Sequence, residues 1–185
     1  MKDHIKKQLL EAVPKKNGVQ LDWGCGEVPQ EGFLGVDRMP HRMVDIVMDL
    51  EDMKKYKDFP SDCCSLMIAS HIVEHFKPWL FIPIMDEWWR IMKIGGELMI
   101  ATPYAGSHSY WQDPTHCNGC NETTWEYFDP YGRKSQGQFY KIYRPMPWEV
   151  VPGKDMWEIE GNLEVVLKKR ADDPLYHKWP SQGVL

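Results

Sequence analysis

The chain has 185 residues, of which 43% are apolar, and its formal net charge at pH 7 is -5. This length and apolar fraction predict one globular domain over residues 1–185. The acidic balance argues against a nucleic-acid partner held through its phosphates, and no apolar run reaches the roughly 18 residues of a membrane span. Five cysteines, two of them adjacent, make a poor disulfide framework. They indicate a reducing compartment, and we expect a cytoplasmic protein.

The N-terminal part of the chain predicts a helix, a strand and a glycine turn. Apolar residues at helical spacing predict a surface helix over residues 3–13, ended by Pro14. An apolar run predicts a strand over residues 19–23. Gly24 and Gly26 follow it, and because neither has a Cβ, the backbone there can turn sharply and approach a ligand closely. Asp22, two residues before the first glycine, can place a carboxylate beside a cationic group.

The connection after this turn is short. Nine residues, 24–32, separate the first strand from the next apolar run, whereas a parallel crossover normally needs a dozen or more. Pro29 and Gly32 also discourage a helix. We therefore expect a loop or a single turn here.

Two further predicted strands end in acidic residues. Residues 33–37 end in Asp37, and residues 45–49 end in Asp49. In open α/β sheets, ligands bind at the carboxyl edge of the strands. The two carboxylates therefore predict a ligand site at this edge.

The rest of the chain alternates predicted helices and strands. We expect a short helix over residues 51–57, a strand over 64–69 and a helix whose apolar face spans 81–92 and which Gly95-Gly96 ends. Further strands are expected over residues 97–102 and 139–143, with a hairpin of 157–160 and 163–167. Together these elements predict an α/β fold, a doubly wound sheet of about seven strands, mostly parallel with an antiparallel C-terminal element.

Residues 103–137 form an insertion rich in aromatic residues, His, Asn and Asp. Thr123 and Glu126 have the spacing of a helix capping box. An insertion of this length in a compact domain is usually either functional or disordered, and its aromatic content favours an ordered lid. The aromatic side chains either stack on a substrate or pack the insertion onto the sheet: Tyr104, Tyr110, Trp111, Trp125, Tyr127 and Phe128.

This order of elements resembles the class I S-adenosylmethionine-dependent methyltransferases, and within them the small type 11-like branch. The resemblance covers roughly residues 19–130 and is carried by several phrases: Leu21-Asp-Trp-Gly-Cys-Gly, Gly35-Val-Asp, Met48-Asp-Leu-Glu, Ala69-Ser-His-Ile-Val-Glu-His, Arg90-Ile-Met-Lys-Ile-Gly-Gly-Glu and Asp113-Pro-Thr-His. It implies a Rossmann-like fold and methyl transfer from S-adenosyl-L-methionine. The aromatic, net-acidic composition favours a small-molecule acceptor.

The resemblance also implies roles for individual residues. Asp22 and the glycine turn would hold the ammonium group of the cofactor, Asp37 its ribose hydroxyls and Asp49 its adenine amino group. The third glycine that is frequent in this motif is replaced by Val28, which indicates weaker or more exposed binding. The full cofactor-binding set that we expect is Asp22, Gly24, Cys25, Gly26, Asp37, Arg38, Met39, Asp49, Leu50 and Ser70.

A general base is required only if the acceptor must lose a proton. His71, Asp113 and His116 are the candidates. We assign no metal site. His71 and His75 share a helical face, but Ile72 occupies the place where zinc proteases have Glu. His108 and His116 with Cys117 and Cys120 leave a zinc site open as an alternative.

Two other functions are consistent with the sequence. The acid after the second strand also suits a nicotinamide-dependent oxidoreductase, but Pro29 replaces the last glycine of that fingerprint. The short glycine connection leaves open a non-catalytic S-adenosylmethionine-binding or scaffold protein. Cofactor binding without methyl transfer would favour this second alternative.

Overall fold

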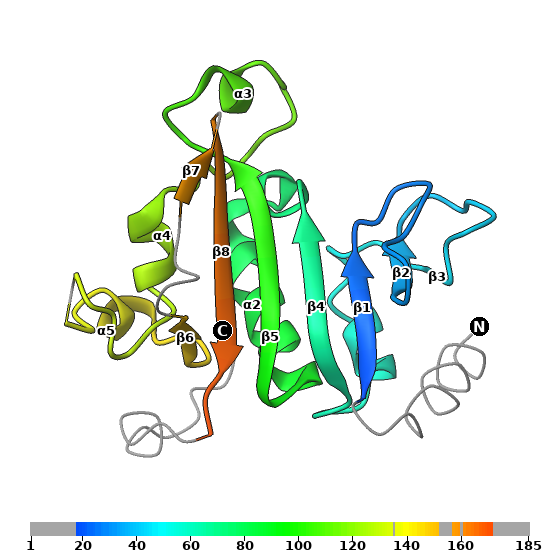
Figure 1. The fold of residues 1–185 in the computed structure, drawn as a ribbon, viewed down its shortest axis with the longest axis horizontal. Helices are drawn as coiled ribbons and strands as arrows, with labels where there is room; N and C mark the ends of the chain where they lie inside the picture. Colours follow the sequence, from blue (N-terminus) through cyan, green and yellow to red (C-terminus); the bar gives the residue numbers. More distant parts are fainter. Residues whose placement is uncertain (1–17, 135, 152–156, 160, 172–185) are drawn as a thin grey trace.

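The computed structural model describes residues 18–134, 136–151, 157–159 and 161–171. In this part of the chain, eight strands form one sheet in the order β3-β2-β1-β4-β5-β8-β6, with β7 also paired to β8 (Figure 1). The strands are β1 (Val19–Trp23), β2 (Leu34–Asp37), β3 (Ile46–Val47), β4 (Cys64–Ser70), β5 (Met92–Pro103), β6 (Trp148–Val150), β7 (Trp157–Ile159) and β8 (Asn162–Lys169).

Strands β1 to β5 pair in parallel, and β8 pairs antiparallel to β5, β6 and β7. The predicted Rossmann-like α/β sheet, mostly parallel with an antiparallel C-terminal element, is confirmed. The C-terminal hairpin is also confirmed, because β7 and β8 flank Gly161, which has a φ of +86°.

Helix α2 (Pro78–Ile91) packs against one face of the sheet and lies behind it in Figure 1. Its predicted apolar face is buried, including Phe81, Ile84 and Trp88. The helix ends at Ile91 and not at Gly95-Gly96, so the expected end was wrong. The physical reason lies outside the helix: the N–H groups of Asp62 and Cys63 donate to the carbonyls of Arg90 and Ile91, each at 3.0 Å.

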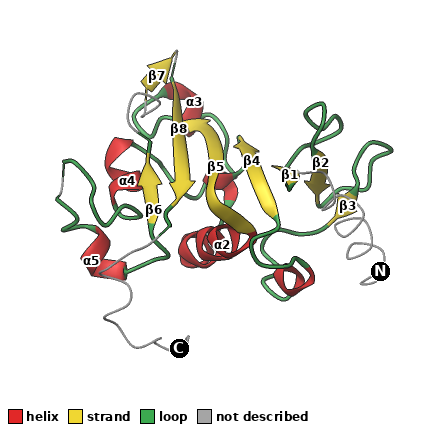
Figure 2. Ribbon diagram, turned by 60° about the horizontal axis from the view of Figure 1, so that its bottom comes forward, coloured by secondary structure: helices red, strands yellow, loops and turns green. Residues whose placement is uncertain are grey.

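The other helical segments are short. They are η1 (Lys55–Asp58), η2 (Val73–His75), α3 (His108–Trp111), α4 (Glu122–Glu126) and α5 (Tyr140–Tyr143). In Figure 2, α4 and α5 lie on the side of the molecule where β8 and β6 end the sheet. The N-cap of α4 is Asn121, which forms a capping box with Thr124. A helix here was predicted, but Thr123 is not its cap.

Several expected elements differ in the structure. The strand expected over residues 45–49 is only β3 (Ile46–Val47), and the strand expected over 97–102 begins earlier, at Met92. The strand predicted over residues 139–143 is a helical turn, α5, because Phe139 and Tyr143 lie four residues apart and both contact the ring of Tyr127. The helix predicted over residues 51–57 is only the single turn η1. The helix predicted over residues 3–13 lies outside the described residues. Of the helices that the structure describes, none combines the length and apolarity needed to cross a membrane.

An aromatic cluster supports the end of β1. Trp23 is fully buried and stacks on Trp88 of α2 at 5.6 Å between ring centroids, with Phe59 at 5.3 Å. Such ring pairs add to the stabilisation from burial. This packing fixes the residue that immediately precedes Gly24.

Candidate functional site

A cavity of about 480 Å³ lies where the parallel strands β1, β2, β3 and β4 end. This volume is within the range of small-molecule sites, and the position is the one that open α/β sheets use for ligands. Its walls come from the segments that follow these four strands and from the insertion. The lining residues are Gly24, Asp37, Arg38, Met39, Asp49, Leu50, Glu51, His71, Ile72, His75, Phe76 and Thr115.

The glycine turn folds back over β2. The N–H of Gly24 donates to the carbonyl of Val36 at 2.8 Å. The connection over residues 24–32 contains turns and no helix, as the sequence predicted. It packs on Gly35, where an added Cβ would lie 2.4 Å from Pro29 Cγ. The missing crossover helix is thus replaced by a short loop that lies directly on the neighbouring strand.

Asp37 forms the wall between β1 and β2. Its Oδ2 accepts a hydrogen bond from the N–H of Gly26 at 3.0 Å, and its Oδ1 accepts one from Met39 at 2.8 Å. A carboxylate oxygen can accept more than one hydrogen bond. Asp37 is therefore held rigidly by the backbone and can still accept bonds from ligand hydroxyls.

Another part of the cavity wall, Asp49 to Glu51, is joined to the start of α2 by an ion pair. Asp49 Oδ1 accepts a hydrogen bond from the N–H of Glu51, and Glu51 Oε2 lies 2.8 Å from Lys77 Nζ. Burial raises the pKa of Glu51, but the hydrogen bonds from Lys77 outweigh it and hold the pKa below its usual range. This ion pair connects the segment after β3 to the residue before α2.

Six of the ten expected cofactor residues line the cavity: Gly24, Asp37, Arg38, Met39, Asp49 and Leu50. The other four are adjacent but do not line it: Asp22, Cys25, Gly26 and Ser70. Asp22 is 7% exposed and its Oδ2 accepts a hydrogen bond from the N–H of Gln30 at 2.8 Å. Burial raises the pKa of Asp22, and the bond from Gln30 opposes this.

Cys25 and Ser70 also lie away from the cavity wall. A Cβ added at Gly35 would lie 2.8 Å from Cys25 Sγ, so this thiol lies between the loop and β2. Burial, with a smaller effect of Asp22, raises the pKa of Cys25 to about 11, which keeps the thiol protonated at neutral pH. Ser70 is the exposed last residue of β4.

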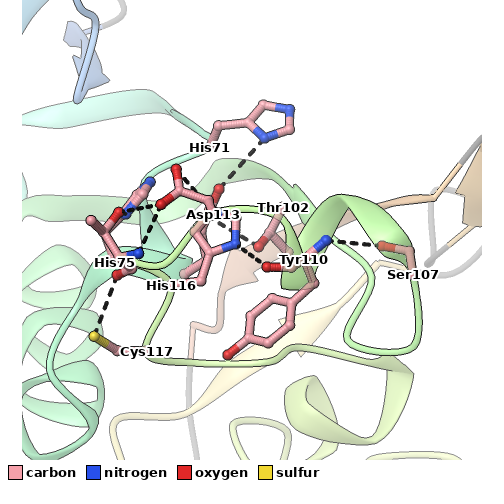
Figure 3. Close-up of polar contacts among 10 residues, drawn as sticks. His71, His75, Thr102, Ser107, Tyr110, Asp113, His116 and Cys117 are labelled. Atoms are coloured by element: carbon pink, nitrogen blue, oxygen red, sulfur yellow. Dashed lines mark hydrogen bonds and ion pairs between the residues drawn. The ribbon is translucent and has the colours of Figure 1, made fainter.

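His71 is the candidate base that lines the cavity. It has a φ of +51°, unusual for a residue other than glycine, and its N–H donates to the carbonyl of Ala101 at 2.8 Å. Its Nδ1 lies 3.5 Å from Glu74 Oε1, and this carboxylate raises the pKa of His71. Figure 3 shows His71 set apart from His75, Asp113 and His116.

Asp113 and His116, the other two candidates, lie behind the cavity wall. Asp113 Oδ1 accepts hydrogen bonds from the N–H and the hydroxyl of Thr115, which lower the pKa of Asp113. His116 Nε2 is 3.9 Å from Asp113 Oδ2, and His116 Nδ1 is 2.7 Å from the carbonyl oxygen of Tyr110. Thr115 and His75, which line the cavity, contact Asp113 and His116, respectively.

The insertion packs onto the body of the protein. Trp125 and Phe128 are buried and contact the ring of Phe81 on α2. Tyr127 stacks on Phe139 at 5.0 Å, and Trp111 is 75% exposed. For Trp125 and Phe128 the packing interpretation is the correct one.

The sequence did not identify five lining residues: Glu51, Ile72, His75, Phe76 and Thr115. Glu51 could have been predicted from the sequence, because it directly follows Leu50 and lies two residues after Asp49. Ile72 and Phe76 give no chemical signal. Thr115 lies in the insertion and contacts His75, and its place at the cavity depends on how the insertion folds.

No protein-family model matches the chain, and no curated protein sequence is found to be similar to it. Solved structures do resemble it. An S-adenosylmethionine-dependent methyltransferase from Archaeoglobus fulgidus is 18% identical, with a TM-score of 0.55 over 91% of this chain and 95% of the other. A putative type 11 methyltransferase from Sulfolobus solfataricus is 12% identical, with a TM-score of 0.52 over 91% and 93%.

A third structure contains bound ligands. The 1,6-didemethyltoxoflavin-N1-methyltransferase of Burkholderia thailandensis, with 1,6-didemethyltoxoflavin and S-adenosylhomocysteine bound, is 10% identical and has a TM-score of 0.57 over 90% of this chain and 76% of the other. At these identities the likeness concerns the fold. The chain has the fold of the class I S-adenosylmethionine-dependent methyltransferases, including those of type 11.

Proposed function

We propose that this protein transfers a methyl group from S-adenosyl-L-methionine to a small-molecule acceptor. One observation carries the proposal: Gly24, Asp37 and Asp49, from the ends of successive parallel strands, line a single cavity in a methyltransferase-like fold. A fold alone does not fix a function. The proposal therefore depends on the chemistry of these residues.

The cavity offers a complementary group to each part of the cofactor. Asp37 can accept hydrogen bonds from the ribose hydroxyls, and Asp49 from the adenine amino group. Met39 and Leu50 supply apolar contacts for the adenine ring. Gly24, with no side chain, lets the methionine part approach the backbone. Asp22 acts indirectly here, since it fixes the loop through Gln30.

The reaction would be an in-line displacement at the sulfonium. A lone pair of the acceptor forms the new bond to the methyl carbon while the carbon–sulfur bond breaks, which leaves S-adenosylhomocysteine. Such a reaction depends mainly on positioning. Where the acceptor must lose a proton, we propose His71 as the base, because it is the candidate that lines the cavity. Asp113 and His116 do not line it and would act only through Thr115 and His75, which they contact.

The five cysteines are free thiols. This supports the cytoplasmic location that we propose, because oxidising compartments favour disulfides.

Binding of S-adenosylhomocysteine, measured by isothermal titration calorimetry, tests the proposal. We expect saturable binding to the wild-type protein, and Asp37→Asn should weaken it at least about tenfold, because one carboxylate oxygen becomes an amide. Asp52→Asn is the matched control: Asp52 also accepts a backbone hydrogen bond, from Lys54, but does not line the cavity. Absence of binding to the wild type would refute the proposed function.

A further inference from the structure

Three side chains with metal-binding atoms meet beside the cavity, and one of them, His75, lines it. Glu74 and His75 belong to η2, and His116 belongs to the insertion. One potential ligand atom from each lies within 4.8 Å of those of the other two. The rings of His75 and His116 meet edge to face at 4.8 Å between centroids. Among the residues that the structure describes, no other group of three His, Cys, Asp or Glu side chains is gathered in this way.

Glu74 has an oxygen that the protein leaves unused. The residue is fully buried, and its Oε2 accepts a hydrogen bond from Thr102 Oγ1 at 3.1 Å. Its Oε1 is also buried but accepts no hydrogen bond from any described residue; His71 Nδ1 is 3.5 Å away, in a loose ion pair. A buried carboxylate oxygen without a close partner is costly. A cation at this position would satisfy it.

The ring contacts leave the lone pair of each histidine on Nε2, and the other contact of His116 Nε2 is a long one, 3.9 Å to Asp113 Oδ2. His116 Nδ1 contacts the carbonyl oxygen of Tyr110, which can only accept, so Nδ1 carries the proton and Nε2 has the lone pair. The hydroxyl of Thr115 donates to Asp113 Oδ1 at 2.7 Å. Its oxygen must then accept from His75 Nδ1 at 3.0 Å, which leaves the lone pair of His75 on Nε2.

These outer contacts are the kind that support metal ligands. Metal-binding histidines almost always donate their second ring N–H to a carbonyl, a carboxylate or a similar acceptor. Here Tyr110 plays that role for His116, and Thr115, itself held by Asp113, plays it for His75.

We propose that Glu74, His75 and His116 bind a divalent first-row transition-metal ion, through Oε1 and the two Nε2 atoms. Two imidazoles and one carboxylate form a donor set typical of Zn²⁺, Fe²⁺ and related ions, and three protein ligands leave further positions open. The sequence-based alternative grouped His116 with His108, Cys117 and Cys120. The structure groups it with Glu74 and His75 instead.

The site adjoins the cofactor cavity, since His75 and Thr115 line it. This consequence rests on the proposed function: an open coordination position there can hold the oxygen or nitrogen of an acceptor beside the methyl group. A metal ion also lowers the pKa of a bound hydroxyl. The site therefore favours acceptors that carry a hydroxyl group.

Titration of metal-free protein with Co²⁺, followed by visible absorption, tests the site directly. We expect about one equivalent to bind, and Zn²⁺ to displace it. His75→Asn and His116→Asn should each weaken Co²⁺ binding at least about tenfold. In both variants the amide N–H can replace Nδ1–H, so the contact with Thr115 or Tyr110 is retained while the ligand atom is lost. His108→Asn is the matched control, because His108 is exposed and lies outside the cluster.

Three results would overturn the metal site: no saturable binding to the wild type, unchanged binding to both folded variants, or a thiolate-to-cobalt absorption band that Cys117→Ser removes. Thermal melts followed by circular dichroism establish which variants fold. If His116→Asn does not fold, His75→Asn and the wild type still decide. S-adenosylhomocysteine binding, measured on the same samples, separates the two proposals, because metal binding without it would retain the site and refute the methyltransferase function.

Discussion

Gly24 and Gly26 share a left-handed backbone but differ in their surroundings. Their φ values are +69° and +61°, a region that costs a residue with a Cβ about 1–2 kcal/mol. A Cβ at Gly24 would lie 2.7 Å from Ile72 Cγ1, whereas a Cβ at Gly26 would meet nothing within 4 Å. We predict that Gly24→Ala lowers the free energy of unfolding by about 2–4 kcal/mol, and Gly26→Ala by about 1 kcal/mol.

Urea unfolding of the two variants measures this difference. Because Ile72 lines the cavity, Gly24→Ala should also weaken S-adenosylhomocysteine binding more than Gly26→Ala does. Equal losses of stability in the two variants would show that the backbone conformation alone, and not the contact with Ile72, requires glycine at position 24.

The sequence predicted residues of the cavity wall where their place at the end of a parallel strand is enough to bring them to the sheet edge. Asp37 and Asp49 follow parallel strands, and the edge of such a sheet is a ligand site, so both were predicted and both line the cavity. Asp22 also belongs to a strand end, but its carboxylate is used by the N–H of Gln30. Which backbone group a loop presents to a carboxylate depends on the folded loop, and the sequence does not reveal it.

Helix α2 and the segment before β6 are joined by a half-buried carboxylate. Asp86 Oδ1 accepts a hydrogen bond from the N–H of Met146 at 2.7 Å. Burial, opposed by that bond, raises the pKa of Asp86 to about 7, from an ordinary value of about 4. Between these two pH values the folded protein binds more protons at Asp86 than the unfolded chain does. The contribution of Asp86 to stability is therefore present at low pH and is lost as the pH rises from about 4 to about 7.

The variant Asp86→Asn tests whether the raised pKa of Asp86 makes the stability of the protein depend on pH. Asparagine keeps an oxygen for the N–H of Met146 but does not ionise. We predict that the variant is more stable than the wild type at pH 8, by on the order of 3 kcal/mol, and that this advantage disappears near pH 4. Urea unfolding across this pH range measures the difference. A constant difference at all pH values would contradict the raised pKa of Asp86.

Elements with a clear apolar period or run were predictable, and the segment over residues 139–143 was not. The 3.6-residue spacing of Phe81, Ile84 and Trp88 predicted α2, and the apolar runs predicted β1, β2, β4 and β5. Residues 139–143 have aromatic and β-branched side chains that favour a strand. They form α5 because their partner is a single ring, Tyr127, and not a neighbouring strand. Tertiary contacts of this kind leave no periodic signal in the sequence.

One hydrophobic cluster runs through the described residues. It connects Trp23 below the cavity with Trp88 on α2, Trp125 in the insertion and Leu167 on β8. Leu50 and Phe76, which line the cavity, belong to the same cluster. The cavity, the insertion and the antiparallel strands thus share one core. That the chain is a single domain stays a prediction, and in the described residues Trp125 belongs to the shared core.

A single cooperative unfolding transition is the consequence of this shared core. Tryptophan fluorescence reports mainly on the buried indoles, and far-ultraviolet circular dichroism reports on the sheet and helices, so we predict that their thermal transitions coincide.

S-adenosylhomocysteine at about 100 times its dissociation constant should stabilise the folded state by about 2.7 kcal/mol. For a chain of this size, that raises the melting temperature by roughly 5–10 °C. Because the cavity and the core belong to one unit, both probes should move together. Two separate transitions, of which the ligand shifts only one, would show that the cofactor site and the insertion unfold independently.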